Sequence, residues 1–157
     1  MTKTPNSPKT PPPSPTGLPS AGAMLERDRA SAMLGIRAIR TDPGHAIVEM
    51  LVRADMLNGF DVVHGGLIFS LADTAFAISC NEDERVTLAA GADITFLAPV
   101  RLGTTLTATA LRRARTGRSG LYDVTVTDHN GLVVAEFRGR SRSTSLPRPT
   151  ITEGSAS

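Results

Sequence analysis

The segment from His64 to Asn81 constrains the fold more than any other part of this sequence. It contains no proline, is rich in leucine and alanine, and carries apolar residues almost all the way round the helix that it would form. A helix that is apolar on nearly every face must be buried on most of them. Asn81, a residue that tolerates the left-handed conformation, is expected to end it. The rest of the chain therefore has to enclose this helix.

Runs typical of β-strands lie on both sides of the helical segment. Two precede it and four follow it, with turn signals such as Asn130-Gly131 between them. The expected strands span residues 36–40, 45–53, 86–98, 104–113, 120–128 and 132–142. Apart from a short amphipathic helix over Met24–Leu34, ended by Gly35, no other helix is expected. We predict an α+β fold in which an antiparallel sheet curls around one helix, with the last four strands forming a meander.

The composition changes sharply near residue 23. Seven of the 11 prolines lie in the first twenty positions. We expect a disordered tail over residues 1–23, one domain over 24–146 and a flexible tail over 147–157. The only lysines, Lys3 and Lys9, fall in the first tail, so fifteen arginines face fifteen acidic residues in the remainder. A neutral domain with few aromatic residues argues against nucleic-acid binding.

Other residue types exclude further classes of protein. Cys80 is the only cysteine, which excludes an intramolecular disulfide framework and a zinc site built from several thiolates. The three histidines are not spaced as metal ligands, so no metal site is expected. No apolar run reaches the roughly 20 residues that cross a bilayer, and the N-terminus lacks a hydrophobic signal core. These features predict a cytoplasmic protein without a bound cofactor and without a membrane partner.

Asp73 is the most informative single residue, because it lies in the middle of the apolar helix. Burying an unpaired carboxylate costs several kcal/mol in practice. A carboxylate at this position therefore needs either a function or a partner at an interface. Both explanations are open from the residues alone, since perturbed carboxylates occur at active sites and elsewhere.

Two glycines open the same helix. Gly65 and Gly66 follow His64 at the end where unpaired backbone N–H groups and the helix dipole favour developing negative charge. Without side chains, they would let a ligand approach the backbone closely. A tight turn into the helix would also explain the two glycines, so the pair alone does not establish a site.

The spacing of Gly66 and Asp73 indicates an oligomer if both residues act on one substrate. Seven positions make about two helical turns, which places the residues on nearly the same face but roughly 10 Å apart along the axis. Two antiparallel helices related by a two-fold axis would bring Asp73 of one subunit to the Gly66 amide of the other. On that condition, the active site is expected at a dimer interface.

The motif His-Gly-Gly-x-x-Phe-x-Leu-Ala-Asp-x-Ala-Phe-Ala, at residues 64–77, resembles that of the hotdog-fold acyl-CoA thioesterases. The resemblance is strongest to the phenylacetate-degradation branch, usually called PaaI, which residues 56–59, 93–99 and 103–108 also fit. It extends from about Met24 to Thr144. It implies a curved antiparallel sheet wrapped around one central helix, with subunits paired into homodimers or homotetramers and sites at the dimer interface.

The resemblance also assigns roles to single residues. Asp73 would be the catalytic carboxylate, either as a general base for water or as a nucleophile that forms an anhydride. Gly66 would supply the amide that polarises the thioester carbonyl. Asn58 would help to orient water or the carboxylate, and His64 would shape the turn and contact the thioester region. The residues assigned to substrate binding are Gly65, Phe69, Phe76, Arg101 and Arg118, of which the arginines suit the phosphates of coenzyme A.

Together these residues predict an acyl-CoA thioesterase that converts phenylacetyl-CoA, or a related aryl or medium-chain acyl-CoA, to the free acid and coenzyme A during phenylacetate catabolism. Relatives that process hydroxybenzoyl substrates can carry a hydroxyl one turn after the carboxylate, but this chain has Ala77 there. The main alternative is a non-catalytic acyl-CoA-binding hotdog protein. A hotdog dehydratase would need a differently placed Asp/His pair, which the sequence does not contain. The residues leave the acyl preference and the choice between dimer and tetramer open.

Overall fold

The computed structural model describes residues 21–81 and 83–148. In chain order the elements are helices α1 (Ala21–Glu26) and α2 (Arg29–Leu34), strands β1 (Arg37–Asp42) and β2 (His45–Leu51), the 3-10 helix η1 (Ala54–Met56), helix α3 (Gly65–Cys80), and strands β3 (Arg85–Phe96), β4 (Thr105–Thr116), β5 (Ser119–Thr127) and β6 (Val133–Pro147). Helix α1 includes residues 21–23, at the end of the expected first tail. Residues 1–20 and 149–157 lie outside the described part, so the two tails stay predictions.

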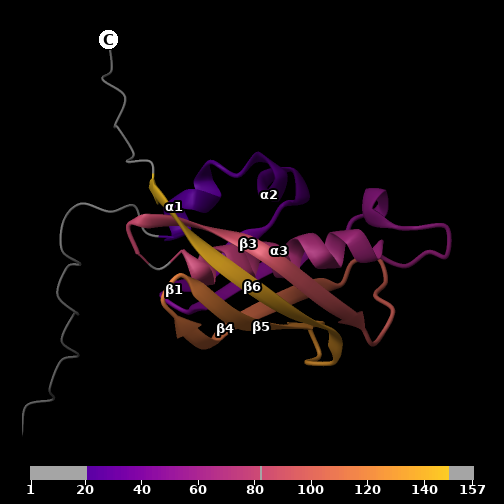
Figure 1. Ribbon diagram of the computed structural model, residues 1–157. Coiled ribbons are helices and arrows are strands. Elements are labelled where there is room, and N and C mark those ends of the chain that lie inside the picture. Colours follow the sequence, from indigo (N-terminus) through magenta and orange to yellow (C-terminus); the bar gives the residue numbers. More distant parts are fainter. Residues whose placement is uncertain (1–20, 82, 149–157) are drawn as a thin grey trace, which may run out of the picture.

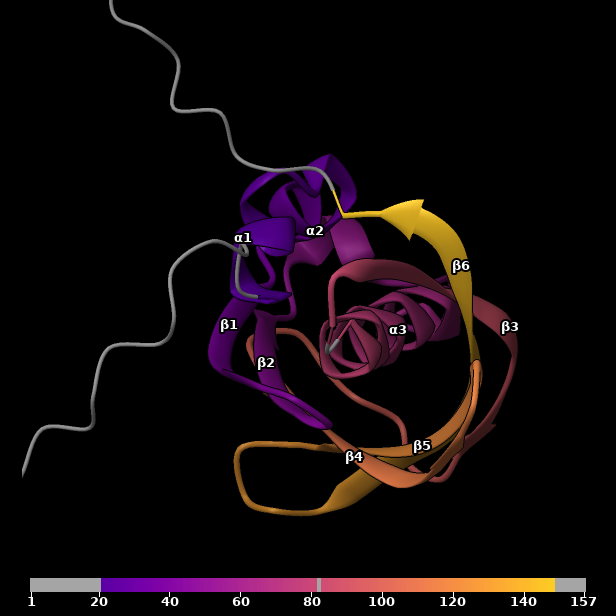
Figure 2. The same ribbon diagram turned by 60° about the vertical axis from the view of Figure 1, so that its left-hand side comes forward.

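The six strands form one antiparallel sheet that curls around α3 (Figure 1). Figure 2 looks more nearly along the helix and shows the sheet enclosing it on three sides, with α1 and α2 on the fourth. The strand order is β1-β2-β4-β5-β6-β3. The α+β hotdog architecture expected from the sequence is confirmed.

The expected four-stranded meander is wrong in one respect. Strands β4, β5 and β6 do form a meander, but β3 pairs with β6 at the far edge of the sheet, and β4 pairs with β2 instead. The cause lies in residues 97–104, which form a loop too long for a tight hairpin. The loop is bonded to the end of β2, where Gly103 N–H donates to the carbonyl of Val52 and Val52 N–H donates to Thr104, both at 2.9 Å. The chain thus crosses from β3, at one edge of the sheet, to β4, which lies beside β2.

The core lies between α3 and the concave face of the sheet. In β2, β5 and the first half of β4 every second residue is buried, as the alternation in the sequence predicts, whereas residues 111–116 of β4 are all exposed. The fully buried residues of α3 include Leu71, Ala72, Ala75 and Phe76. Ala46 of β2 and Ala108 of β4 belong to the same buried cluster, and their small side chains leave room for the helix to lie close to the sheet.

The helix expected over Met24–Leu34 is in fact two short helices, α1 and α2. The break falls at Asp28, whose carboxylate accepts a hydrogen bond from Ser31 N at 3.0 Å and so caps α2. An aspartate in this position competes for the backbone and starts a new helix rather than continuing the old one. Gly35 ends α2 with φ of 70°, in the left-handed region, as expected.

Candidate active site

The N-terminal end of α3 is shaped by His64. The imidazole Nδ1 accepts a hydrogen bond from Gly66 N–H at 3.1 Å, which makes His64 the cap of the helix. The Gly66 amide, the expected donor to a thioester carbonyl, therefore has a partner within its own subunit. Gly65 lies against Phe96, and a Cβ on Gly65 would come within 3.0 Å of that ring. A residue with a side chain would push the ring away.

Asn58 lies near the same end of the helix. Its backbone N–H donates to the carbonyl of Val62 at 2.8 Å, and its side-chain oxygen accepts from Phe60 N–H at 2.9 Å. These bonds close the loop before α3, where Leu57 and Val63 form an antiparallel bridge. The structure thus brings Asn58, His64 and Gly66 to one end of α3.

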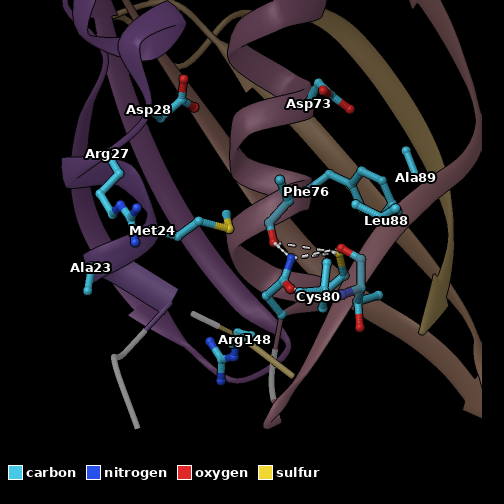
Figure 3. A pocket seen from close by; sticks show the side chains of 14 residues that line it. Ala23, Met24, Arg27, Asp28, Asp73, Phe76, Cys80, Leu88, Ala89 and Arg148 are labelled. Atoms are coloured by element: carbon cyan, nitrogen blue, oxygen red, sulfur yellow. Dashed lines mark hydrogen bonds between the residues drawn. The ribbon is translucent and has the colours of Figure 1, made fainter. Parts of the chain in front are cut away.

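Asp73 lies about two turns further along the helix, on the wall of a cavity of about 560 Å³. Figure 3 shows the cavity between α3, the N-terminal helices and the start of β3. Most of its wall is apolar and includes Met24, Phe76, Cys80 and Leu88. Neither Gly66 nor His64 lines this cavity, so one subunit does not bring both halves of the expected machinery together.

Burial raises the pKa of the Asp73 carboxyl above its ordinary value, and the negative charge of Asp28 raises that pKa further. Within the described part of the chain, no group donates a hydrogen bond to this carboxylate that would offset the effect. A half-buried carboxylate with a raised pKa is a stronger base than an exposed one. It is suited to accept a proton from water near neutral pH.

Phe76 and Phe69 have different surroundings. Phe76 lines the cavity beside Asp73 and also packs against Tyr122, with ring centroids 5.4 Å apart. It lies over Gly139 of β6, where an added Cβ would come within 2.7 Å of the ring. Phe69 instead contacts Phe137 in an edge-to-face pair at 5.3 Å and does not line the cavity. The structure therefore brings Phe76, but not Phe69, to Asp73.

The two arginines assigned to coenzyme A lie at opposite ends of the sheet. Arg101 is exposed in the loop beside the N-terminal end of α3, where Val63 N–H donates to Val100 O at 2.8 Å. Arg118 is exposed in the turn between β4 and β5 and donates from Nε to the carbonyl of Ser143 at 2.8 Å. One subunit cannot bring both to the same phosphate.

Several polar residues at or beside the cavity were not singled out by the sequence reasoning, among them Asp28, Ser31 and Arg148. Asp28 faces the cavity from the cap of α2, and Ser31 links it to Thr74 of α3. The signal that could have revealed Asp28 is a helix-capping aspartate three positions before a serine, within a pattern that was interpreted as one continuous helix. Arg148, which follows β6, also lines the cavity.

The described residues contain no group of three or more His, Cys, Asp or Glu side chains placed to hold a metal ion. In residues 21–81 and 83–148, no helix has the length and apolar character needed to cross a membrane.

Known proteins share both the sequence and the fold. Residues 60–135 match the profile of the thioesterase superfamily. The acyl-coenzyme A thioesterase PaaI of Escherichia coli is 46% identical over 78% of this chain and 87% of its own length. The solved structure of E. coli PaaI, from the phenylacetic acid degradation operon, superposes with a TM-score of 0.79 over 82% of this chain and 93% of that chain, at 44% identity. A Streptococcus mutans protein solved with acetyl-CoA bound superposes with a TM-score of 0.67 over 69% of this chain and 88% of that chain, at 26% identity.

Proposed function

The chain belongs to the thioesterase superfamily and is a thioester hydrolase of the acyl-CoA class, and we propose that its substrate is phenylacetyl-CoA or a related aryl or medium-chain acyl-CoA. The observation that carries this proposal is Asp73, a half-buried carboxylate without a hydrogen-bond donor on the wall of an apolar cavity. The cavity, of about 560 Å³, has a volume in the range of small-molecule sites. Its apolar wall suits the acyl group.

The proposed reaction needs a base and a donor to the developing oxyanion. In the general-base route, Asp73 takes a proton from water as the water oxygen attacks the thioester carbonyl carbon. The tetrahedral intermediate then expels the thiolate, which takes the proton back from Asp73. The products are the free acid and coenzyme A. In the nucleophilic route, Asp73 itself attacks, the thiolate leaves, and water hydrolyses the resulting anhydride.

The oxyanion donor in this proposal is the Gly66 amide of the partner subunit. The helix N-terminus favours negative charge, and the two residues lie roughly 10 Å apart within one helix, which is too far for a single carbonyl. His64 accepts the Gly66 N–H at 3.1 Å in the described state, so the amide has to share or exchange this bond when substrate binds. Asn58, at the same end of α3, is proposed to orient water or the carboxylate.

The other assignments follow from the same proposal. Gly65 lets the substrate approach the backbone closely at the helix end, and Phe76 lines the acyl cavity beside Asp73. Phe69 packs α3 against Phe137 of β6. Arg101 and Arg118, from different subunits, are proposed to contact the phosphates of coenzyme A. The protein is proposed to act in the cytoplasm as a homodimer or homotetramer in phenylacetate catabolism. Its domain is proposed to span residues 24–146 between two tails.

The test is thiol release from phenylacetyl-CoA, followed with a chromogenic thiol reagent. Asp73→Asn keeps the size of the side chain but removes the base and nucleophile, so we expect hydrolysis to fall by about 100-fold or more. Asp42→Asn is the matched control, because Asp42 is exposed at the end of β1 and bonds only Arg40 among the described residues. Full turnover by a folded Asp73→Asn protein would rule out this mechanism. Binding of acyl-CoA without thiol release by the unmodified protein would favour the non-catalytic alternative.

A further inference from the structure

Two carboxylates face the same cavity from different elements. Asp73 projects from α3, and Asp28 lies across from it at the start of α2 (Figure 3). We propose that Asp28 is a positioning residue for hydrolysis, which holds a fixed negative charge opposite Asp73 and keeps that carboxylate a stronger base. This inference rests on the proposed function, because it concerns the base of that reaction.

Asp28 is held in place by two hydrogen bonds from one residue. One carboxylate oxygen accepts from Ser31 N–H at 3.0 Å, and the other accepts from Ser31 Oγ at 2.6 Å. Both oxygens therefore have donors, which suits an ionised carboxylate. A charge fixed in this way cannot turn out of the cavity without breaking the cap of α2.

The same serine connects Asp28 to the catalytic helix. Ser31 is only 2% exposed, and its hydroxyl lies 3.0 Å from Thr74 Oγ1. Thr74 follows Asp73 directly, and because Ser31 gives its own proton to Asp28, the Thr74 hydroxyl proton is shared between Ser31 Oγ at 3.0 Å and the carbonyl of Ser70 at 2.9 Å. This buried link fixes the cap of α2 against α3 at the residue next to Asp73. The relative position of the two carboxylates is thus built into the fold.

The remaining ionisable groups on the cavity wall are Arg27 and Arg148, which are cationic, and the Cys80 thiol. Burial is the first cause of the raised pKa of Asp73 and the charge of Asp28 is the second. Neither arginine lowers this pKa. Like charges in a poorly solvated site disfavour ionisation of both. Asp73 accepts no hydrogen bond within the described residues that would offset this repulsion.

A cap alone would also explain an aspartate at this position, and the variant Asp28→Asn separates the two roles. Asparagine is as good a helix cap as aspartate, so α2 should keep its start while the charge is lost. The acid limb of the pH profile of kcat/KM should move to lower pH, because Asp73 loses its neighbour's repulsion. The plateau rate should fall by roughly threefold, because a weaker base accepts a proton less readily.

Glu26→Gln is the matched control. It removes one negative charge from the same segment, two positions away, but Glu26 is exposed and does not line the cavity. Its acid limb should coincide with that of the unmodified enzyme.

Asp28→Ser, which also caps a helix without a charge, repeats the test if the asparagine variant does not fold. An acid limb unchanged in a folded Asp28 variant, or moved equally by Glu26→Gln, would overturn the inference. Absence of hydrolysis by the unmodified protein would instead contradict the proposed function.

Discussion

At the scale of single residues, Asp73 should make the protein less stable at neutral pH. Its pKa is raised in the folded state by burial and by Asp28, so folding favours the protonated carboxyl. The stability that this preference gives is complete below the ordinary carboxyl pKa of 3.8 and is lost as the pH rises through the higher pKa of the folded state. At pH 7 the ionised carboxylate therefore opposes folding.

The variant Asp73→Asn tests this consequence. Asparagine carries no charge at any of these pH values, so the variant should melt a few degrees above the unmodified protein at pH 7. The difference should shrink as the pH is lowered toward 3.8, the ordinary carboxyl value. Thermal melts followed by circular dichroism at several pH values provide the measurement. The melting temperature of the variant minus that of the unmodified protein should be larger at pH 7 than at pH 4. A smaller difference at pH 7 would contradict the sign of the effect.

The residues that sequence reasoning could identify are those whose oddity is local. Asp73 is a charge in an apolar helix, and Gly66 is a glycine at a helix start, so each is conspicuous within its own segment. Asp28 is unremarkable in its segment and becomes significant only because α2 packs against α3 beside Asp73. A contact between segments 45 positions apart in the chain leaves no pattern in either one.

At the scale of elements, the pattern of apolar residues predicts six strands by their alternation and one long helix by its almost wholly apolar surface. It could not place β3 in the sheet, because alternation records which face is buried and not which strand lies beside it. The end of α3 shows the same limit. The helix does end before Asn81, but the backbone there has φ of −88°, outside the left-handed region that the sequence suggested. Asparagine suits this position because of the hydrogen bonds that its side chain makes, and not because of its backbone conformation.

Asn81 joins the end of α3 to the start of β3. Its side-chain nitrogen donates to Ala77 O at 2.9 Å and to Thr87 O at 3.0 Å, and its oxygen accepts from Thr87 N–H at 3.0 Å. The residue is only 5% exposed. Asn81→Ala would leave buried backbone groups without partners, which should lower the free energy of unfolding by about 2–4 kcal/mol.

The same change should reach the cavity, because the start of β3 forms part of its wall. We expect the KM for acyl-CoA to rise more than kcat falls, since Asp73 itself is not altered. Denaturant unfolding and steady-state kinetics measure the two effects. Asn130→Ala is the control, because Asn130 is exposed in the loop between β5 and β6 and should change neither quantity. Equal stability of both variants would show that the bridge contributes nothing.

At the scale of the whole molecule, the two halves of the proposed site do not meet within the described subunit. Asp73 and the proposed acyl cavity lie along α3, while Gly66, His64 and Asn58 gather at its N-terminal end. Both halves lie on nearly the same face of one helix, since seven positions make about two turns. A two-fold axis that places two such helices side by side in opposite directions would unite the halves twice, once at each end of the pair.

Mixing two inactive variants tests this arrangement directly. Asp73→Asn removes the proposed base, and Gly66→Pro removes the proposed amide donor, in the first turn of α3 where this amide bonds the His64 side chain and no helical carbonyl. If each site combines one residue from each subunit, a mixed dimer has one intact site and one site with both defects. Random pairing in equal co-expression makes half of the dimers mixed, so about a quarter of the full activity should return. Asp73→Asn co-expressed with Asp73→Ala is the control and should restore nothing. The first pair could also fail to recover activity although both variants fold and mixed dimers are demonstrated. That result would mean that each subunit completes its own site. The oxyanion donor would then come from the same subunit as Asp73.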